Sequence, residues 1–191
     1  PKSNLASTSI YVFSWDKLRR YLTEDENNPQ SSNDFGKDVL PAMLDAGERM
    51  FAYRFSGYWK DVGTIDSLWE ANMDLVDQPP KFDLNDRSWS IYSRNMALAP
   101  HYVGQNAKIT NSTVTEGCFI DGEIKHSVIF GGVELGEGSV VSDSVIMPGA
   151  KIGKNVVIEK AVIGADAVIG DESGAEVGVE EDICKGSMVE A

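Results

Sequence analysis

The sequence predicts an α/β segment followed by an all-β parallel β-helix, because its hydrophobic pattern changes near residue 80. Before that point, short apolar runs alternate with helical patterns. From about residue 103, single aliphatic residues recur at steps of six, six and five, and a Ser-Val-Ile or Ala-Val-Ile phrase restarts the cycle every 17 residues. These steps do not fit a helix. They fit a short strand plus a turn, used three times per coil.

The first 30 residues predict a strand, a helix and a loop. Residues 10–13 (Ile-Tyr-Val-Phe) have the composition of a buried strand. Ser14 can cap a helix over residues 15–22, and the polar run 24–30 predicts a loop.

A second helix and a second strand follow. The helix is expected to begin at Asn33 or Asp34 and to end at Gly47, with a kink or break at Pro41. Proline predicts a break because it has no N–H and its ring clashes with the preceding turn. Residues 49–55 predict the strand.

A third helix leads into a linker. Thr64 is a good N-cap for a helix that reaches about Val76, where Pro79 and Pro80 are expected to stop it. The predicted domains are an α/β domain at 1–80, an extended linker at 81–102 and a repeat domain at 103–191.

The repeat predicts triangular coils whose inward aliphatic side chains stack on those of the next coil. Ile146, Ile152, Ile158 and Ile163 carry the clearest register, which is rougher upstream and fades after Ile169. One coil cannot bury its own apolar face, so several must stack. The alternative is a β-sandwich, which would show strict alternation and longer strands.

Composition narrows the class of protein. A formal net charge of −13 disfavours nucleic-acid binding, and no apolar run of about 18 residues is present, so no membrane span is expected. The residues from Gly170 onward are acidic and predict a solvated tail or edge. Cys118 and Cys184 are isolated, which suits a reducing cytoplasm, and His101 and His126 lack partners at zinc-ligand spacing.

Residues 58–64 (Tyr-Trp-Lys-Asp-Val-Gly-Thr) form the densest candidate site. Here a predicted strand ends, and Gly63 turns the chain into a capped helix. Asp61 is placed as a hard-oxygen ligand for Mg²⁺, and Trp59 can wall a sugar pocket. The alternative is structural: Asp61 caps the turn and Trp59 fills the core.

Two further motifs carry polar residues at element boundaries. Residues 4–11 place small hydroxyl side chains just before the first predicted strand, and residues 31–38 place an acid and an aromatic at a helix start. Taken alone, turn chemistry and helix capping explain both motifs.

Together these motifs resemble the bacterial glucose-1-phosphate adenylyltransferases. The resemblance rests on residues 4–13, on 34–38 (Asp-Phe-Gly-Lys-Asp) and on 58–64 followed by Trp69, all in family order and ahead of a hexapeptide repeat. It implies a C-terminal part of a Rossmann-like nucleotidyltransferase domain followed by a left-handed parallel β-helix. It also implies a cytoplasmic enzyme that joins glucose 1-phosphate to ATP, giving ADP-glucose and pyrophosphate for glycogen synthesis.

The resemblance also implies roles for individual residues. Glucose 1-phosphate would be bound by residues that match the family's sugar-phosphate motifs: Ser7, Tyr11, Asp34, Phe35 and Trp59. Asp61 would be the catalytic carboxylate that holds Mg²⁺. Family enzymes are homotetramers or heterotetramers whose β-helix serves assembly and allosteric control.

Departures from the family pattern leave alternatives open. Thr8-Ser9 stand where Met-Gly is usual, and no glycine-rich phosphate loop is present. We therefore expect this chain alone to be inactive and to associate through uncovered apolar surface. The alternatives are another sugar-1-phosphate nucleotidyltransferase, a non-catalytic regulatory subunit, and a hexapeptide acyltransferase using His126.

Overall fold

The computed structural model describes residues 5–94, 96–172 and 188–189, and the chain divides into two compact units between Trp59 and Lys60. Each unit is described by itself. Most of the acidic C-terminal stretch, together with Cys184 and the start of the 4–11 motif, lies outside the described residues.

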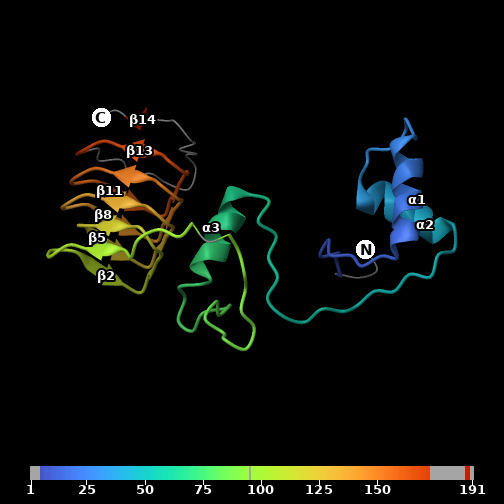
Figure 1. Ribbon diagram of the computed structural model, residues 1–191, viewed down its shortest axis with the longest axis horizontal. Helices are drawn as coiled ribbons and strands as arrows, with labels where there is room; N and C mark the ends of the chain where they lie inside the picture. Colours follow the sequence, from blue (N-terminus) through green and yellow to red (C-terminus); the bar gives the residue numbers. More distant parts are fainter. Residues whose placement is uncertain (1–4, 95, 173–187, 190–191) are drawn as a thin grey trace. The chain divides into compact units, whose positions relative to one another are not determined.

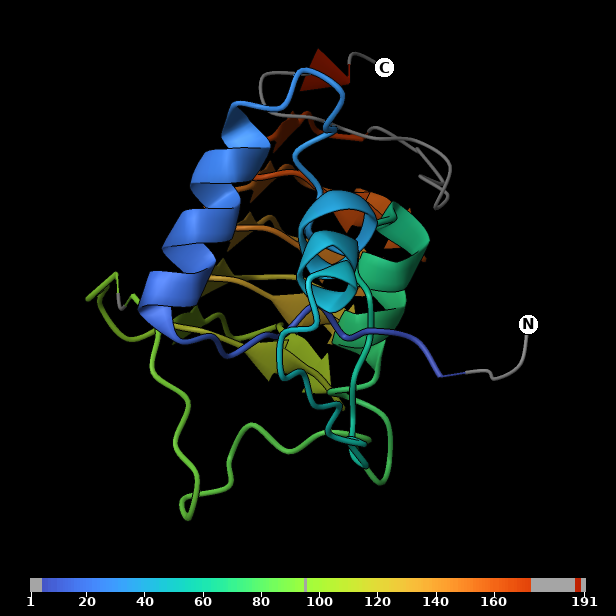
Figure 2. The ribbon, with the colours of Figure 1, turned by 90° about the vertical axis from the view of Figure 1, so that its right-hand side faces the viewer.

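Helices and a small apolar core make up the first unit. α1 spans Trp15–Glu26, a π-helical turn η1 spans Phe35–Val39, and α2 spans Leu40–Asp45. α1 and α2 lie side by side (Figure 2). Tyr21 of α1 packs with Val39 and Met43, and Phe13, Leu22 and Phe35 line this core. Near the expected kink or break at Pro41, the helix type changes from π to α at Leu40, while the backbone at Val39 and Leu40 stays right-handed helical.

α1 is longer than predicted, so the expected loop at 24–30 was wrong for residues 24–26. Its last turns are supported by side-chain pairs one turn apart. Arg20 faces Glu24 at 3.7 Å, and the Thr23 hydroxyl donates to the carbonyl of Arg19.

The two strands predicted in this unit do not form, and those predictions were wrong. Residues 10–13 and 49–55 are extended, but neither segment is assigned as a strand. Val12 is 98% exposed and Tyr53 is 89% exposed. A strand needs a neighbour for its N–H and C=O groups, and the described residues of this unit supply none.

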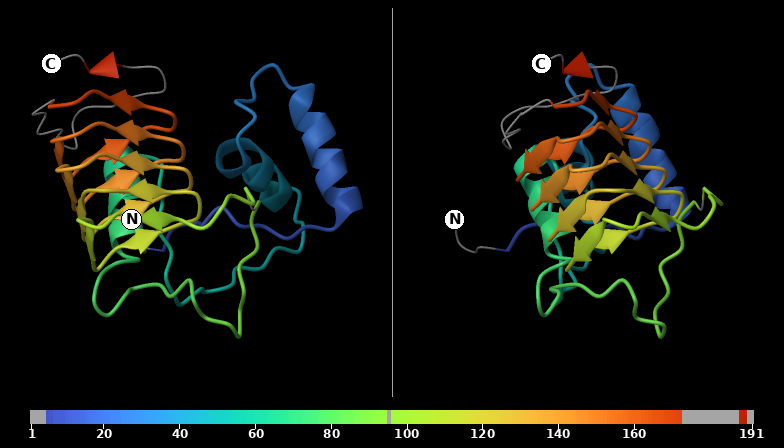
Figure 3. Two further views of the ribbon diagram at one scale, coloured as in Figure 1. Left: turned by 60° about the vertical axis from the view of Figure 1, so that its left-hand side comes forward. Right: turned by 90° about the vertical axis from the view of Figure 1, so that its left-hand side faces the viewer.

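Stacked coils make up most of the second unit, as predicted (Figure 1). Across the described residues the strands form parallel sheets in three columns, seen side-on in Figure 3, with order β1-β4-β7-β10-β13-β14, β11-β8-β5-β2 and β12-β9-β6-β3. The strands are β1 Tyr102–Val103, β2 Lys108–Thr110, β3 Thr113–Val114, β4 Phe119–Ile120, β5 Glu123–Lys125, β6 Val128–Ile129, β7 Glu134–Leu135, β8 Val140–Ser142, β9 Val145–Ile146, β10 Lys151–Ile152, β11 Val157–Glu159, β12 Val162–Ile163, β13 Val168–Ile169 and β14 Met188–Val189.

The repeat register is confirmed by the strand pairing. Ile129, Ile146 and Ile163 lie opposite one another in successive coils and are buried. The rough upstream steps come from one shortened coil, because Lys108 pairs with Glu123 at an offset of 15 residues whereas Glu123 pairs with Val140 at 17. The coil loses these residues at the corner after β4.

Gly122 makes the shortened corner possible. A Cβ atom built there would lie 2.5 Å from the carbonyl oxygen of Ser139 in the next coil. Since that neighbour is backbone, any larger residue would push two coils apart.

α3, Ile65–Met73, covers the outer face of the sheet formed by β3, β6, β9 and β12. Val128 and Val145 point away from the coil interior, yet both are buried against Met73 and Val76. α3 ends at Met73, before the predicted end near Val76, so the prolines are not what stops it. A turn follows Met73 directly, in which the Val76 and Asp77 N–H groups donate to the Met73 carbonyl. Within 81–94 and 96–101 the chain has neither helix nor strand, and β1 begins at Tyr102, the last residue of the predicted linker.

Candidate functional site

Three of the expected sugar-phosphate residues come together in the first unit. The hydroxyl groups of Ser7 and Tyr11 are 3.0 Å apart. The ring of Tyr11 stacks on Phe35 at 5.8 Å between centroids, and Phe13 closes the cluster at 5.9 Å from each ring. Ser7 remains exposed, so a hydroxyl pair stands at the edge of an aromatic wall. Such a surface can hydrogen-bond a phosphate or sugar and pack against the apolar side of the ring.

Asp34 occupies the N-cap of η1, next to Phe35. Its Oδ1 accepts a hydrogen bond from the Lys37 N–H at 2.8 Å, so the capping interpretation of this residue holds. The cap does not use up the side chain, which is exposed. Asp34 can therefore hold the helix start and still offer an oxygen to a ligand.

Asp61 sits in the turn that leads into α3. Its Oδ1 accepts from the Gly63 N–H at 3.0 Å, and the Thr64 hydroxyl accepts from the Ser67 N–H at 3.2 Å, which confirms the predicted N-cap. Within the described residues Oδ2 of Asp61 has no hydrogen-bond partner, and the side chain is exposed. Trp59, which ends the first unit, is about half exposed and fills no core.

Sequence reasoning missed the charged pairs that tie this turn to α3. Lys60 Nζ forms an ion pair with Glu70 and lies 3.8 Å from the buried Asp74. Lys81 pairs with the other oxygen of Asp74 and, at 3.4 Å, with Asp77. The spacing of Glu70 and Asp74, one helical turn apart, was the available signal.

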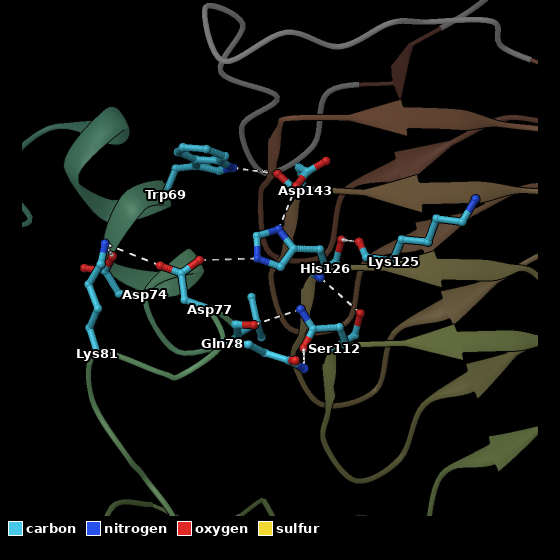
Figure 4. Close-up of polar contacts among 12 residues, drawn as sticks. Trp69, Asp74, Asp77, Gln78, Lys81, Ser112, Lys125, His126 and Asp143 are labelled. Carbon is cyan, nitrogen blue, oxygen red and sulfur yellow. Dashed lines mark hydrogen bonds and ion pairs between the residues drawn. The ribbon is translucent and has the colours of Figure 1, made fainter.

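A stacked corner of the β-helix holds the other side of α3 (Figure 4). The same corner in successive coils is occupied by Asn111, His126, Asp143 and Lys160, each with a left-handed backbone, at φ of 45, 42, 48 and 49° respectively. The Trp69 indole donates to the Asp143 carbonyl at 2.7 Å, and the Asn111 amide donates to the Val76 carbonyl at 2.9 Å.

His126 belongs to this corner and has a packing role. Its Nδ1 lies 2.7 Å from a carboxylate oxygen of Asp143, and its Nε2 lies 3.6 Å from Asp77 (Figure 4). The ring therefore bridges the coil and the segment that follows α3. This geometry gives no support to the acyltransferase alternative, which needs a histidine free to take a proton from a substrate.

Buried serines complete the corner. The Ser127 hydroxyl donates to the Lys125 carbonyl and accepts from the Ser144 N–H, and the Ser144 hydroxyl repeats the pattern toward Ala161. The serines of the Ser-Val-Ile phrase thus satisfy backbone groups where the chain turns inside the coil. This role is structural.

No group of three or more potential metal ligands is present among the described residues, so Asp61 belongs to no such cluster there. No helix of the described chain has the length and apolar character needed to cross a bilayer.

Comparisons with known proteins also divide the chain in two, with the division between residues 78 and 98 rather than between Trp59 and Lys60. A family described as nucleotidyl transferase matches residues 1–78, and a family described as GlmU-like C-terminal hexapeptide matches residues 98–187. Proteins named glucose-1-phosphate adenylyltransferase match over 143 residues, 75% of this chain. The relatives from Bacillus cereus, Desulforamulus reducens and Clostridium botulinum are 59%, 54% and 54% identical, and the match covers 38%, 36% and 37% of their lengths. The chain thus spans little more than a third of each relative.

Proposed function

Because the chain belongs to the family of glucose-1-phosphate adenylyltransferases, we propose that the full-length protein joins glucose 1-phosphate to ATP, releasing pyrophosphate and ADP-glucose for glycogen synthesis. The observation that carries this proposal is the identity of 54–59% with relatives of that name. The clustered Ser7, Tyr11 and Phe35 support it, since a matching family motif and a suitable surface coincide.

The sugar phosphate is assigned to the first unit. The Ser7 and Tyr11 hydroxyls would donate to phosphate or sugar oxygens, and Phe35 would pack against the sugar ring. Asp34 would accept hydrogen bonds from sugar hydroxyls, and Trp59 would wall the pocket. Fixing the substrate in this way lowers the entropic part of the barrier.

Asp61 is assigned as a ligand of Mg²⁺. Its oxygen-only donor set suits this cation, and the hydrogen bond from Gly63 leaves Oδ2 available. A single carboxylate is consistent with Mg²⁺, which is bound through one or two carboxylates together with substrate phosphates and water. When bound, the cation supplies charge neutralisation at the phosphates.

The proposed reaction is a displacement at phosphorus. A phosphate oxygen of glucose 1-phosphate attacks the α-phosphorus of ATP, the bond to the β-phosphate oxygen breaks, and pyrophosphate leaves. Ser7 and Tyr11 would orient the attacking phosphate. Asp61 would hold the cation that neutralises negative charge at the phosphates. Electrostatic stabilisation of this kind is the main resource for phosphoryl transfer.

Substitution of Asp61 in the full-length enzyme tests the assignment. Asp61→Asn is expected to lower turnover by about two or more orders of magnitude, because a neutral amide is a poor Mg²⁺ ligand. Asp66→Asn, an exposed acid of the first turn of α3, is the matched control and should keep normal turnover. Near-normal turnover in Asp61→Asn would refute the metal role. Preference of the wild type for GTP over ATP would point to another sugar nucleotidyltransferase.

Assembly and location are part of the same proposal. We infer a cytoplasmic homotetramer, or a heterotetramer with a related subunit, because the family resemblance assigns assembly to the β-helix. Light scattering on the full-length protein tests the tetramer, and a clean monomer at working concentration would contradict it.

A further inference from the structure

The start of η1 is held by a carboxylate that the proposed chemistry does not use. Among the described residues, Oδ2 of Asp38 accepts three hydrogen bonds: from the Ser32 hydroxyl at 2.6 Å, the Ser32 N–H at 3.1 Å and the Asp34 N–H at 3.1 Å. A main-chain hydrogen bond joins the same two residues, because the Asp38 N–H donates to the Asp34 carbonyl at 2.9 Å. Asp34 and Asp38 are thus joined through both side chain and main chain.

This arrangement is a capping box displaced by one residue. In an α-helix the acid that reaches back to the N-cap N–H stands three residues after the cap. Here the cap is Asp34 and the acid is Asp38, four residues on. The first turn is π-helical, with a wider ring that carries one more residue, so the fourth residue comes under the cap N–H.

The loop held by Asp38 needs this anchor. Asn33 has a left-handed backbone at φ 58°, a conformation that costs free energy for residues other than glycine, although asparagine tolerates it best. The bonds to Ser32 and Asp34 clamp the residues on both sides of Asn33. A second link holds the loop from the other side, because the Ser31 hydroxyl accepts from the Asn33 N–H at 2.9 Å and donates to Asp25 at 2.7 Å. Asp38 is the side chain that joins the residues on both sides of Asn33 to the first turn of η1.

We propose that Asp38 is a positioning residue that sets Asp34 and Phe35 for the sugar phosphate, an inference that rests on the proposed function. Phe35 is the first residue of η1, and its ring stacks on Tyr11, whose hydroxyl meets Ser7. A shift of the cap therefore displaces a wall of the site. The carboxylate of Asp38 points at backbone groups of its own loop, and it is not itself a substrate ligand.

Electrostatics agree with this geometry. The hydrogen bond from the Ser32 hydroxyl, followed by that from the Asp34 N–H, lowers the pKa of Asp38 below its ordinary value. The carboxylate stays ionised at neutral pH, and an ionised acceptor makes stronger hydrogen bonds than a neutral one.

The experiment compares steady-state kinetics of the full-length enzyme carrying Asp38→Ala, Asp38→Asn or Asp45→Asn. Asp38→Ala is expected to raise the KM for glucose 1-phosphate about tenfold, the equivalent of about 1.4 kcal/mol, with the KM for ATP changed less than about twofold. Asp38→Asn keeps an acceptor oxygen and should give a smaller rise. Asp45, an exposed acid at the end of α2, is the control and should change neither value.

Amide exchange of the 191-residue chain provides the second readout. In Asp38→Asn the Ser32 and Asp34 N–H groups should exchange faster, while amides of α1 keep their protection. If Asp38→Ala does not fold, Asp38→Asn carries both readouts alone.

The outcomes separate the two proposals. An unchanged KM for glucose 1-phosphate in both Asp38 variants of an active enzyme overturns the positioning role, as does an equal rise in both substrate KM values. A loss of kcat with unchanged KM values would indicate a purely structural role and would also overturn it. Wild-type enzyme that makes no ADP-glucose would instead refute the proposed function.

Discussion

The outward-facing valines of the β-helix provide a test of how α3 is bound. Val145 and Val157 each begin a strand and each point away from the coil interior, but Val145 is 0% exposed under α3 whereas Val157 is 43% exposed. Val145→Ala removes two buried carbon atoms, worth about 0.8 kcal/mol each, and leaves a cavity, so we expect a loss of about 1.5–2.5 kcal/mol in unfolding free energy. Both changes also replace valine by alanine in a strand, which carries the same loss of strand propensity in each case. Apart from that shared loss, Val157→Ala should lower the unfolding free energy by no more than about 0.5 kcal/mol.

Urea unfolding of the 191-residue chain, followed by circular dichroism of the β-helix, measures the difference between the two variants. A double-mutant cycle of Val145→Ala with Met73→Ala adds the direct coupling, expected at about 0.5 kcal/mol or more for residues in contact. Equal costs for Val145→Ala and Val157→Ala, with no coupling to Met73, would show that α3 does not cover this face in solution.

Two further predictions follow, one for each unit. Hydrogen bonding from Lys17 foremost lowers the pKa of Glu48, so the contribution of Glu48 to stability is present above its unfolded pKa and is lost as pH falls through its folded pKa. The stability gap between wild type and Glu48→Gln, measured by urea unfolding, should therefore be largest near neutral pH and shrink on acidification; a gap that grows in acid would contradict this sign. In the β-helix, Gly122→Ala should cost about 1–3 kcal/mol because its Cβ meets the Ser139 carbonyl. Gly170→Ala, whose Cβ would have no atom of the described residues within 4 Å, should cost less by the same assay, and equal costs would refute the close-approach argument.

The β-helix could be predicted because its determinants repeat along the chain. Every strand from β4 to β13 buries at least one aliphatic side chain, so the spacing of Ile129, Ile146 and Ile163 is enough to predict the fold. The same holds for local signals such as Thr64, whose hydroxyl caps α3 as its position predicts. Family motifs placed Ser7, Tyr11 and Phe35 in one site before any geometry was known, and the structure brings these three together.

Other features depended on partners distant in the sequence. The apolar run 10–13 has strand composition, but a strand exists only where a neighbour accepts its hydrogen bonds. The contacts of Asp38 were hidden for a different reason. Its partners Ser32 and Asp34 are near in the sequence, but the contact with the Asp34 N–H requires a π-helical turn that no local propensity predicts.

The amino-acid sequence alone therefore determined the repeat, its inward residues and the family, because each depends on short-range spacing or on motifs. Only the tertiary structure decided which outward valines are buried, because that depends on where α3 packs, and a pattern along one chain does not encode which surfaces will be adjacent. The structure also decided that the first turn of η1 is π-helical, and this local geometry brings Asp38 to the cap.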